Sequence, residues 1–152
     1  MNMNRKASRN ICGKMIVSAL LAAVLMMILC ACGTAEKLEA YEVGGESIPS
    51  INSVIGKRSV NGVASGIENG MSYKSYNYKS DTVTEDLMTY IFELMEEHGF
   101  IPIVDFNLEN ISGVGQVARE AGDGEILIVE FAYESKSYKI KIMKGEGTLT
   151  FY

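Results

Sequence analysis

Four carboxylates in the second half of the chain are the first residues to consider for catalysis. Asp105, Glu109, Glu130 and Glu134 are of the type that glycosidases use in pairs, one as the acid and one as the base or nucleophile. The sequence alone places no two of them at a working separation. Since the chain carries 19 acidic residues, a solvated acidic face is the simpler interpretation. Hydrolysis by carboxylates is kept as the alternative function.

His98 is the only histidine, and it follows Glu96 and Glu97. Successive residues of a helix point about 100° apart, so these three side chains cannot converge on one metal ion. A cation in the last helical turn, before Gly99, is favoured by the helix macrodipole, which explains His98 without a site. The sequence also lacks the Gly-x-Ser-x-Gly elbow of many serine hydrolases. We therefore expect no metal, no cofactor and no enzymatic activity.

Residues 113–118 read Gly-Val-Gly-Gln-Val-Ala and match the dinucleotide pattern G-x-G-x-x-A, with Glu134 near the distance expected for a ribose ligand. The glycines do not directly follow a predicted strand, and too little chain remains for a doubly wound sheet. The segment is instead predicted to be a loop or a helix N-terminus. It would lie in a connection from Asn110 to Gly124, with a helical turn at Gln116–Ala121.

Three tyrosines in one short run form the candidate interaction surface of the chain. Tyr73, Tyr76 and Tyr78 alternate with Lys74 and Lys79, an arrangement that can serve as a platform for a sugar or a peptide. The alternative is a strand whose tyrosines cover the edge of the core while its lysines face water. Both interpretations remain open from the sequence.

The three cysteines lie close to the N-terminus, at positions 12, 30 and 32, so the rest of the chain has no thiol for a disulfide or a thiolate metal site. Four basic residues and no acid occupy residues 1–14, and an uncharged apolar run follows as far as Leu29, as in an export signal. The run ends in Leu-Cys-Ala-Cys-Gly, residues 29–33, which resembles the lipobox of bacterial lipoproteins. This resemblance implies lipid attachment at Cys32, removal of residues 1–31, and palmitate among the attached acyl chains.

Two other outcomes for this segment are kept open. An apolar run of about 17 to 25 residues can remain uncut as a membrane-spanning helix, and ordinary signal cleavage after Ala35 is the third possibility. Cys30 is less suited to the lipobox than Cys32, because the bulky Leu29 precedes it directly. Two acyl chains anchor a protein stably, whereas one is marginal. The expected location is the cell membrane, with the chain lipid-anchored and facing outside the cytoplasm.

The charge of the remaining chain limits its partners. Removal of residues 1–31 takes away four basic residues and no acid, which changes the formal charge from −5 to about −9 because ten basic residues remain against 19 acidic ones. An acidic domain does not displace the counterions of nucleic acid, so nucleic acid is excluded as a partner. Residues 32–46 are predicted to be a flexible tether, and residues 47–152 are long enough for one domain.

The pattern from Ser47 onward predicts a short helix or turn at Ser47–Gly56 and then a β-hairpin. Two runs rich in Val, Ile, Tyr and Ser, Val60–Glu68 and Met71–Ser80, meet at Asn69-Gly70. Asn-Gly is typical of a type I′ turn, because both residues tolerate a positive φ.

The next element is predicted to be a helix over Val83–His98, with Thr82 and Glu85 as a capping box and Gly99 as a left-handed stop. Its expected core stripe consists of apolar residues three or four positions apart, namely Leu87, Ile91, Leu94 and Met95.

Alternating apolar and polar residues predict the remaining strands. Ile101–Phe106 contains Pro102, which is typical of the start of a strand or of a strand at a sheet edge. Ile126–Tyr133 and Tyr138–Met143 form the clearest strand pair, and Thr148–Tyr152 would add a last strand. The predicted fold is α+β: an antiparallel sheet of about five strands, with the helix Val83–His98 on one face and a signal helix before the domain.

Together, these features predict a membrane-anchored extracytoplasmic lipoprotein whose domain is a non-enzymatic binding or interaction module. Its partners would be the membrane, through lipid on Cys32, and an envelope protein, peptide or glycan. The alternative is a small cell-envelope hydrolase that uses carboxylates. The chain otherwise resembles small uncharacterised bacterial lipoproteins only loosely, and that resemblance implies no site.

Overall fold

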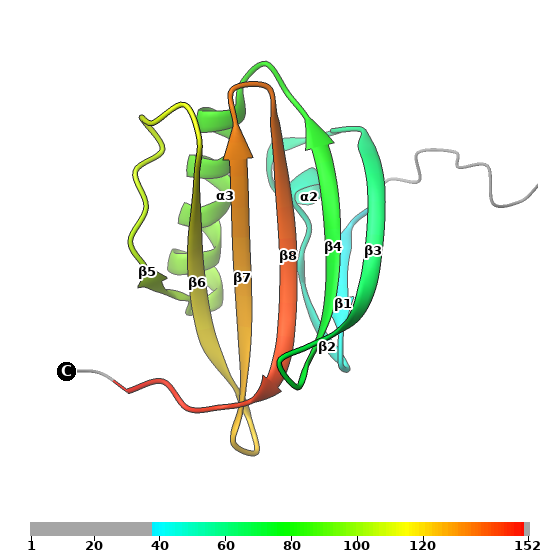
Figure 1. Ribbon diagram of the computed structural model, residues 1–152, viewed down its shortest axis with the longest axis vertical. Coiled ribbons are helices and arrows are strands. Elements are labelled where there is room, and N and C mark those ends of the chain that lie inside the picture. The colour runs from blue at the N-terminus through cyan, green and yellow to red at the C-terminus, as the bar shows by residue number, and fades with distance from the viewer. Residues whose placement is uncertain (1–37, 151–152) are drawn as a thin grey trace, which may run out of the picture. The chain divides into compact units, whose positions relative to one another are not determined.

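The computed structural model describes residues 38–150, which form eight strands and two helices (Figure 1). In chain order these elements are β1 (Ala40–Val43), β2 (Glu46–Pro49), α2 (Ile51–Ile55), β3 (Val60–Glu68), β4 (Met71–Lys79), α3 (Val83–His98), β5 (Ile101–Val104), β6 (Gly113–Gly122), β7 (Glu125–Glu134) and β8 (Ser137–Glu146). The predicted signal segment 1–31 and the predicted lipid site Cys32 lie outside the described residues.

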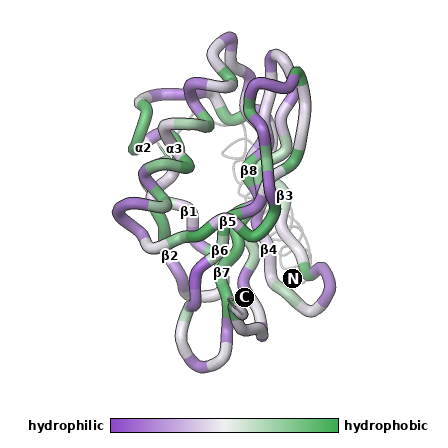
Figure 2. The backbone as a smooth tube through the Cα atoms, turned by 90° about the vertical axis from the view of Figure 1, so that its left-hand side faces the viewer, coloured by the Kyte–Doolittle hydropathy of each residue, from purple (hydrophilic) through white to green (hydrophobic). Residues whose placement is uncertain are grey.

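The strands form a six-stranded antiparallel sheet in the order β3-β4-β8-β7-β6-β5, and β1 and β2 form a separate small sheet. The hairpin β3–β4 joins the last three strands through β8, where Tyr78 lies opposite Tyr138 in the register. Both helices lie on the same side of the large sheet (Figure 2). The α+β class with an antiparallel sheet is confirmed, and the sheet has six strands where about five were expected.

The main core fills the space between this face of the sheet and the helices. Leu127, Val129 and Phe131 of β7 are fully buried there, as are Leu87 and Leu94 of α3. Alternate residues of the strands point to the opposite face, where Ala118, Ile128 and Met143 form a smaller cluster. Because successive side chains of a strand point to opposite faces, the same strands contribute to both the main core and the smaller cluster.

The extra strand is β6, where the sequence predicted a connection with a helical turn at Gln116–Ala121. That prediction is wrong, because residues 113–122 pair with β7 from Glu125 to Tyr133. Gly113 lies opposite Tyr133 and Gly115 lies opposite Phe131. A Cβ on Gly115 would stand 2.4 Å from Cζ of Phe131, so the glycine leaves room for the ring to lie against the strand. Tertiary packing therefore explains this glycine pair, which is neither in a loop nor at a helix N-terminus.

The folded part also begins earlier than the predicted boundary at residue 47. Residues 40–46, expected to belong to the tether, form β1 and the turn into β2. Tyr41 and Val43 are buried in the main core, and this burial holds the strand in place. The short helix α2 begins only at Ile51, with Ser50 as its N-cap, because the residues before it pair with β1.

The hairpin β3–β4 is as predicted. Asn69 and Gly70 have φ values of 51° and 81°, as a type I′ turn requires. The bounds of α3 are also confirmed, and Gly99 ends it with a φ of 69°. The predicted capping box is wrong: Thr82 makes no side-chain bond to the helix backbone, and its hydroxyl donates to the Asp86 carboxylate instead.

The C-terminal end differs from the prediction as well. β8 continues to Glu146, and residues 147–150 form no strand. Leu149 packs against the smaller cluster around Met143 on the second face of the sheet. The remaining part of the predicted last strand, residues 151–152, lies outside the described residues.

Candidate functional site

The tyrosines predicted as an interaction surface are mostly core residues. Tyr76 and Tyr78 are buried, so their rings are not available to a ligand on a surface, and this part of the prediction is corrected. The Tyr76 ring lies 4.6 Å from that of Tyr41, and the Tyr78 ring stacks on Tyr138 at 5.2 Å. The small β1–β2 sheet covers these rings, and nothing in the pattern of β4 alone indicates that cover.

Tyr73 lies on the opposite face of β4 and is half-buried. The Lys141 ammonium lies 4.9 Å from the centre of its ring, and the same ammonium is 2.8 Å from the Glu68 carboxylate. Tyr73 is therefore the only member of the predicted trio whose ring does not belong to the main core. Its ring already holds a cation of the same chain.

The most elaborate polar cluster in the described part surrounds Asp86, which sequence reasoning missed. Arg58 donates to both carboxylate oxygens, from Nε at 2.8 Å and from Nη2 at 2.7 Å. The hydroxyls of Ser80 and Thr82 donate at 2.7 and 3.0 Å, and that of Tyr138 at 3.3 Å. The sequence did contain one signal for this cluster. Residue 86 is an acid on the side of the helix that carries the apolar positions 83, 87 and 90.

This cluster joins elements rather than performing chemistry. Burial by itself disfavours the charged Asp86, but the hydrogen bonds from Arg58, Ser80 and Thr82 outweigh it and hold the pKa of the carboxyl below its usual value. An ionised carboxylate with its oxygens occupied by donors is a poor acid and a poor base near neutral pH. Asp86 therefore fastens the start of α3 to the segment after α2, to the end of β4 and to β8.

A second set of buried hydroxyls continues the network into the core. The Tyr41 and Tyr78 hydroxyls lie 2.7 Å apart, and the Ile51 backbone N–H donates to the Tyr41 hydroxyl at 3.2 Å. Burial raises the pKa of Tyr78 to about 12 and raises the pKa of Tyr41 further. These phenols stay protonated at physiological pH, so they orient α2 and β1 and do not transfer protons.

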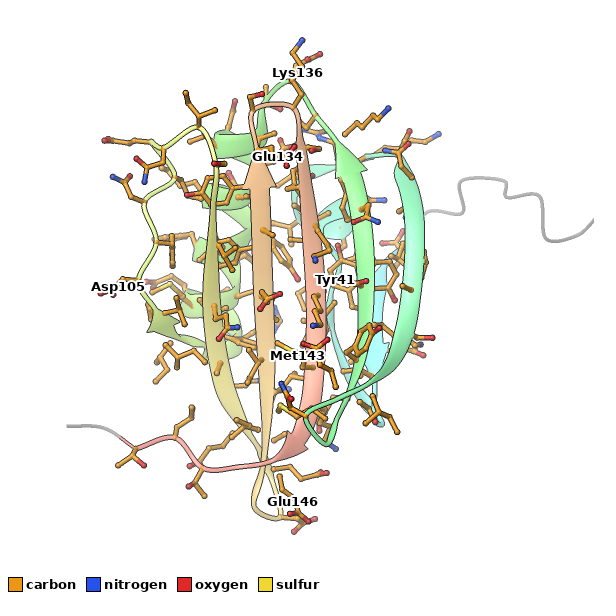
Figure 3. The ribbon with its side chains drawn as sticks, in the orientation of Figure 1. Tyr41, Asp105, Glu134, Lys136, Met143 and Glu146 are labelled. Atoms are coloured by element: carbon orange, nitrogen blue, oxygen red, sulfur yellow. The ribbon has the colours of Figure 1, made fainter. Side chains whose placement is uncertain are left out.

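The four predicted carboxylates lie in different parts of the molecule. Asp105 points outward at the side of the molecule, and Glu134 lies at the far end of β7 (Figure 3). Glu130 accepts a hydrogen bond of 2.8 Å from the Gln116 side-chain amide on the second face of the sheet. Glu109 is exposed in the connection between β5 and β6. Within residues 38–150, no two of these four carboxylates share a hydrogen bond or an ion pair.

His98 lies in the last turn of α3, as predicted, with its Nε2 3.8 Å from a Glu93 carboxylate oxygen. Within the described range no three His, Cys, Asp or Glu side chains are grouped so that they could hold a metal ion. Neither helix of residues 38–150 is long and apolar enough to cross a membrane.

An exposed apolar groove lies between α3 and the connection from β5 to β6. Its volume is about 320 Å³. Met88 and Phe92 are 58% and 65% exposed, although α3 buries its opposite side in the core. Four side chains of α3 line one wall of the groove, and four of the connection line the other. They are Met88, Ile91, Phe92 and Met95 on α3, and Phe106, Asn107, Leu108 and Glu109 on the connection.

The wall of this groove that faces α3 is anchored to the rest of the fold. The Thr84 hydroxyl donates to the Leu108 carbonyl at 3.1 Å, and the Tyr133 hydroxyl donates to the Asn107 carbonyl at 2.6 Å. The Phe106 ring packs edge-on against Phe131 at 4.8 Å. Because these contacts hold the connection against α3 and the sheet, the groove is preformed.

The chain segment that forms both walls of the groove carries acidic but no Lys or Arg side chains. From residue 80 to residue 118 the chain has no Lys or Arg. Asp86 is buried and Glu93 is half-buried, and the other carboxylates of this segment are exposed. They lie just before α3, on α3 and on the connection: Asp81, Glu85, Glu96, Glu97, Asp105 and Glu109. Both signals are visible in the sequence, as apolar residues at 88 and 92 beside the core stripe and as a stretch without basic residues. Met95 was predicted to belong to the core stripe, but it is 36% exposed and lines the groove instead.

A larger hollow, of about 580 Å³, lies at the end of the sheet where β4, β8, β7 and β6 meet. Its lining mixes Lys79 and Lys139 with Glu134 and has few exposed apolar side chains. The apolar groove is the better candidate, because six of its eight lining residues are apolar and exposed apolar surface of this kind commonly marks binding sites.

No known family model, curated protein or solved structure matches this chain.

Proposed function

We propose that this chain is a lipid-anchored extracytoplasmic lipoprotein whose folded domain is a non-enzymatic interaction module. The anchor rests on the sequence: the Leu-Cys-Ala-Cys-Gly motif at residues 29–33 follows an uncharged apolar run, and no cysteine follows Cys32. Lipid on Cys32 would hold the acidic domain at the cell membrane. The domain's own contribution is the binding of a protein or peptide segment.

The observation that carries the binding function is the apolar groove on α3. Burial of apolar surface drives association at roughly 25 cal/mol per Å² removed from water, so exposed Met88 and Phe92 are a source of affinity. Methionine side chains are flexible and polarizable, which lets such a groove adapt to different apolar partners. A preformed groove also reduces the ordering cost of binding.

The charge around the groove selects the partner's chemistry. The exposed carboxylates of residues 80–118 disfavour an acidic segment and attract a basic one. The occupant that fits both features is a cationic amphipathic segment, with an apolar face for the groove and Lys or Arg beside it. An amphipathic helix in a hydrophobic groove is a common mode of peptide recognition.

A direct test uses a synthetic peptide of Leu and Lys with all Leu on one helical face. The core residues of the described part lie between Tyr41 and Met143, so the chain from Cys32 onward, made without lipid, retains the whole core. We expect it to bind the labelled peptide, measured by fluorescence anisotropy. We expect Phe92→Asp to lose this binding, because the carboxylate replaces the most exposed ring of the groove.

The matched control is Val63→Asp on β3. It places the same charge on a similarly exposed apolar residue that does not line the groove. It should bind the peptide as the parent does. Equal binding by the parent and the Phe92→Asp variant, or equal loss in both variants, would contradict docking in the groove without bearing on the lipid anchor.

A further inference from the structure

The outer side of β3 is an open strand edge. β3 is the first strand of the six-stranded sheet and pairs only with β4. In a hairpin with a two-residue turn, the residues on either side of the turn form a hydrogen-bonded pair. Here these residues are Glu68 and Met71. By alternation, the backbone N–H and C=O groups of Val63, Ser65 and Ile67 then point away from β4. No backbone hydrogen bond from within residues 38–150 is made to this side.

β3 also lacks most of the features that protect edge strands from pairing. It is nine residues long, with no Pro and no Lys, and its bulge is confined to the start, between Val60 and Gly62. The edge at the other side of the sheet, β5, has only four residues and contains Pro102. The two edges therefore differ, and only β3 offers a regular row of donors and acceptors.

The side chains at this edge are complementary to a copy of themselves. Val63 and Ile67 are 62% and 77% exposed and point to the same face. In an antiparallel pair of two β3 strands centred on Ser65, Val63 of one copy lies opposite Ile67 of the other. Apolar cross-strand pairs of this kind stabilise sheets.

The side chains on the opposite face of this strand pair also fit the register. Ala64 would lie opposite Gly66, and Gly62 opposite Glu68, so no two like charges meet. Glu68 is already paired with Lys141 at 2.8 Å. A register centred on Val63 would run into the bulge at residue 61, and one centred on Ile67 would run into the turn at Asn69. The register centred on Ser65 uses the regular part of the strand best.

We propose that β3 pairs with β3 of a second copy of this chain, antiparallel and centred on Ser65, so that two sheets join into one. The arrangement has two-fold symmetry and is closed, as in most homodimers. It uses a surface different from the groove on α3. An edge-to-edge strand pair buries less than the roughly 1,200 Å² of a stable interface, so the dimer is transient.

Disulfide trapping suits a transient dimer. In this register the two copies of Ser65 form a hydrogen-bonded pair with Cα atoms about 5.5 Å apart, within the range of about 4.4–6.8 Å that a disulfide spans. The full chain with Ser65→Cys is produced in a bacterial host, and extracts that retain the membranes are treated with a mild oxidant. We expect a cross-linked dimer.

The matched control is Asn61→Cys, an exposed residue on the same strand. Its symmetry mate would be about 27 Å away, at about 3.4 Å for each of eight residues, so it cannot cross-link in this register. The unsubstituted chain, treated alike, gives the background from Cys12, Cys30 and Cys32. Equal cross-linking of Ser65→Cys and Asn61→Cys, no dimer above background, or cross-linking of Ser65→Cys to another protein instead would overturn the proposal.

A second variant tests the side-chain complementarity. Val63→Lys and Ile67→Lys, added together to Ser65→Cys, replace two exposed side chains and leave the core intact. Each introduced Lys would then lie opposite an introduced Lys of the other copy, and we expect about tenfold less cross-linked product. Unchanged cross-linking in this variant, with an unchanged unfolding temperature, would also overturn the pairing.

Discussion

Arg58 and Asp86 form a two-pronged ion pair that links the segment after α2 to the first turn of α3. Two guanidinium nitrogens reach the two carboxylate oxygens at 2.8 and 2.7 Å, and only 3% of the Asp86 side chain is exposed. Such planar pairs are geometrically specific as well as strong. The pair sets where the N-terminal turn of α3 sits against the rest of the fold, and α3 provides one wall of the groove.

Asp86→Asn should destabilise the fold strongly. The variant leaves Arg58 beside an uncharged amide and weakens the bonds from Ser80 and Thr82. Because Asp86 is buried but Arg58 is 29% exposed, we expect a loss of about 2–3 kcal/mol, in the range of a hydrogen bond to a charged group. Urea unfolding at pH 7 measures the loss. The control Asp81→Asn changes an exposed acid whose carboxylate is 3.8 Å from Lys136, and it should have almost no effect. Equal stability of the Asp86→Asn variant and the parent would show that the pair does not stabilise the fold.

The same carboxylate predicts a pH dependence. The pKa of Asp86 is lower in the folded chain than in the unfolded chain, where it is about 3.9. Its stabilising contribution is therefore fully present above that unfolded value and is lost as the pH falls through the lower, folded one. The difference in unfolding free energy between the parent and Asp86→Asn should shrink as the pH falls below about 4. A difference that stays constant down to pH 2 would contradict this assignment.

Gly115→Ala should be destabilising because of the close approach of a ring. The added Cβ would stand 2.4 Å from Cζ of Phe131 and 2.8 Å from Cβ of Phe106, so buried groups must shift at a cost of about 1–3 kcal/mol. Thermal and urea unfolding would show the loss. Gly62→Ala on β3 is the matched control, since its Cβ would meet only the end of the Asn77 side chain, at 3.2 Å. Similar stabilities of the two variants would contradict the packing argument for β6.

Salt should weaken binding of the cationic peptide to the groove. Exposed charges attract over about 10 Å at 0.1 M salt and over about 3 Å at 1 M, so affinity should fall as salt is added and then level off at the apolar contribution. Glu109→Gln, on the rim, should weaken binding about twofold at low salt, as expected for one exposed charge pair. Anisotropy titrations at several salt concentrations provide the measurement. Affinity that rises with salt would indicate a purely apolar contact.

The lipid anchor can be tested by mass spectrometry of the N-terminal fragment from a bacterial host. We expect the mature chain to begin at Cys32 with attached acyl chains. Cys32→Ser should remove the lipid and leave the chain uncut, whereas Cys30→Ser should leave lipid attachment unchanged. An intact Met1 in the unsubstituted chain would instead support a membrane-spanning segment.

Several elements were predictable because their signals are local. Asn69-Gly70 specifies a tight turn with positive φ at both residues, and the flanking runs then pair with each other in the only register that the turn permits. Gly99 ends α3 for the same conformational reason. The alternation in Ile126–Tyr133 and Tyr138–Met143 likewise identified β7 and β8, which are neighbours in the chain and in the sheet.

β6 and the tyrosines could not be predicted in this way. The strand 113–122 begins with Gly113 and Gly115 where local preference favours a loop, and only the rings of Tyr133 and Phe131 on the neighbouring strand explain these two glycines. The burial of Tyr76 depends on the ring of Tyr41, 35 residues earlier in the chain. Similarly, Asp86 is an ordinary helical acid until Arg58 is placed against it.

The sequence by itself determined the α+β class, the hairpin at Asn69-Gly70, the extent of α3 and the acidic character of the chain. It also carries the whole case for a lipid on Cys32, since a short linear motif needs no fold to be recognised. The tertiary structure decided which apolar residues are left in contact with water. Phe92 and Leu94 are apolar residues of the same helix. The placement of α3 on the sheet buries Leu94 and leaves Phe92 in an open groove.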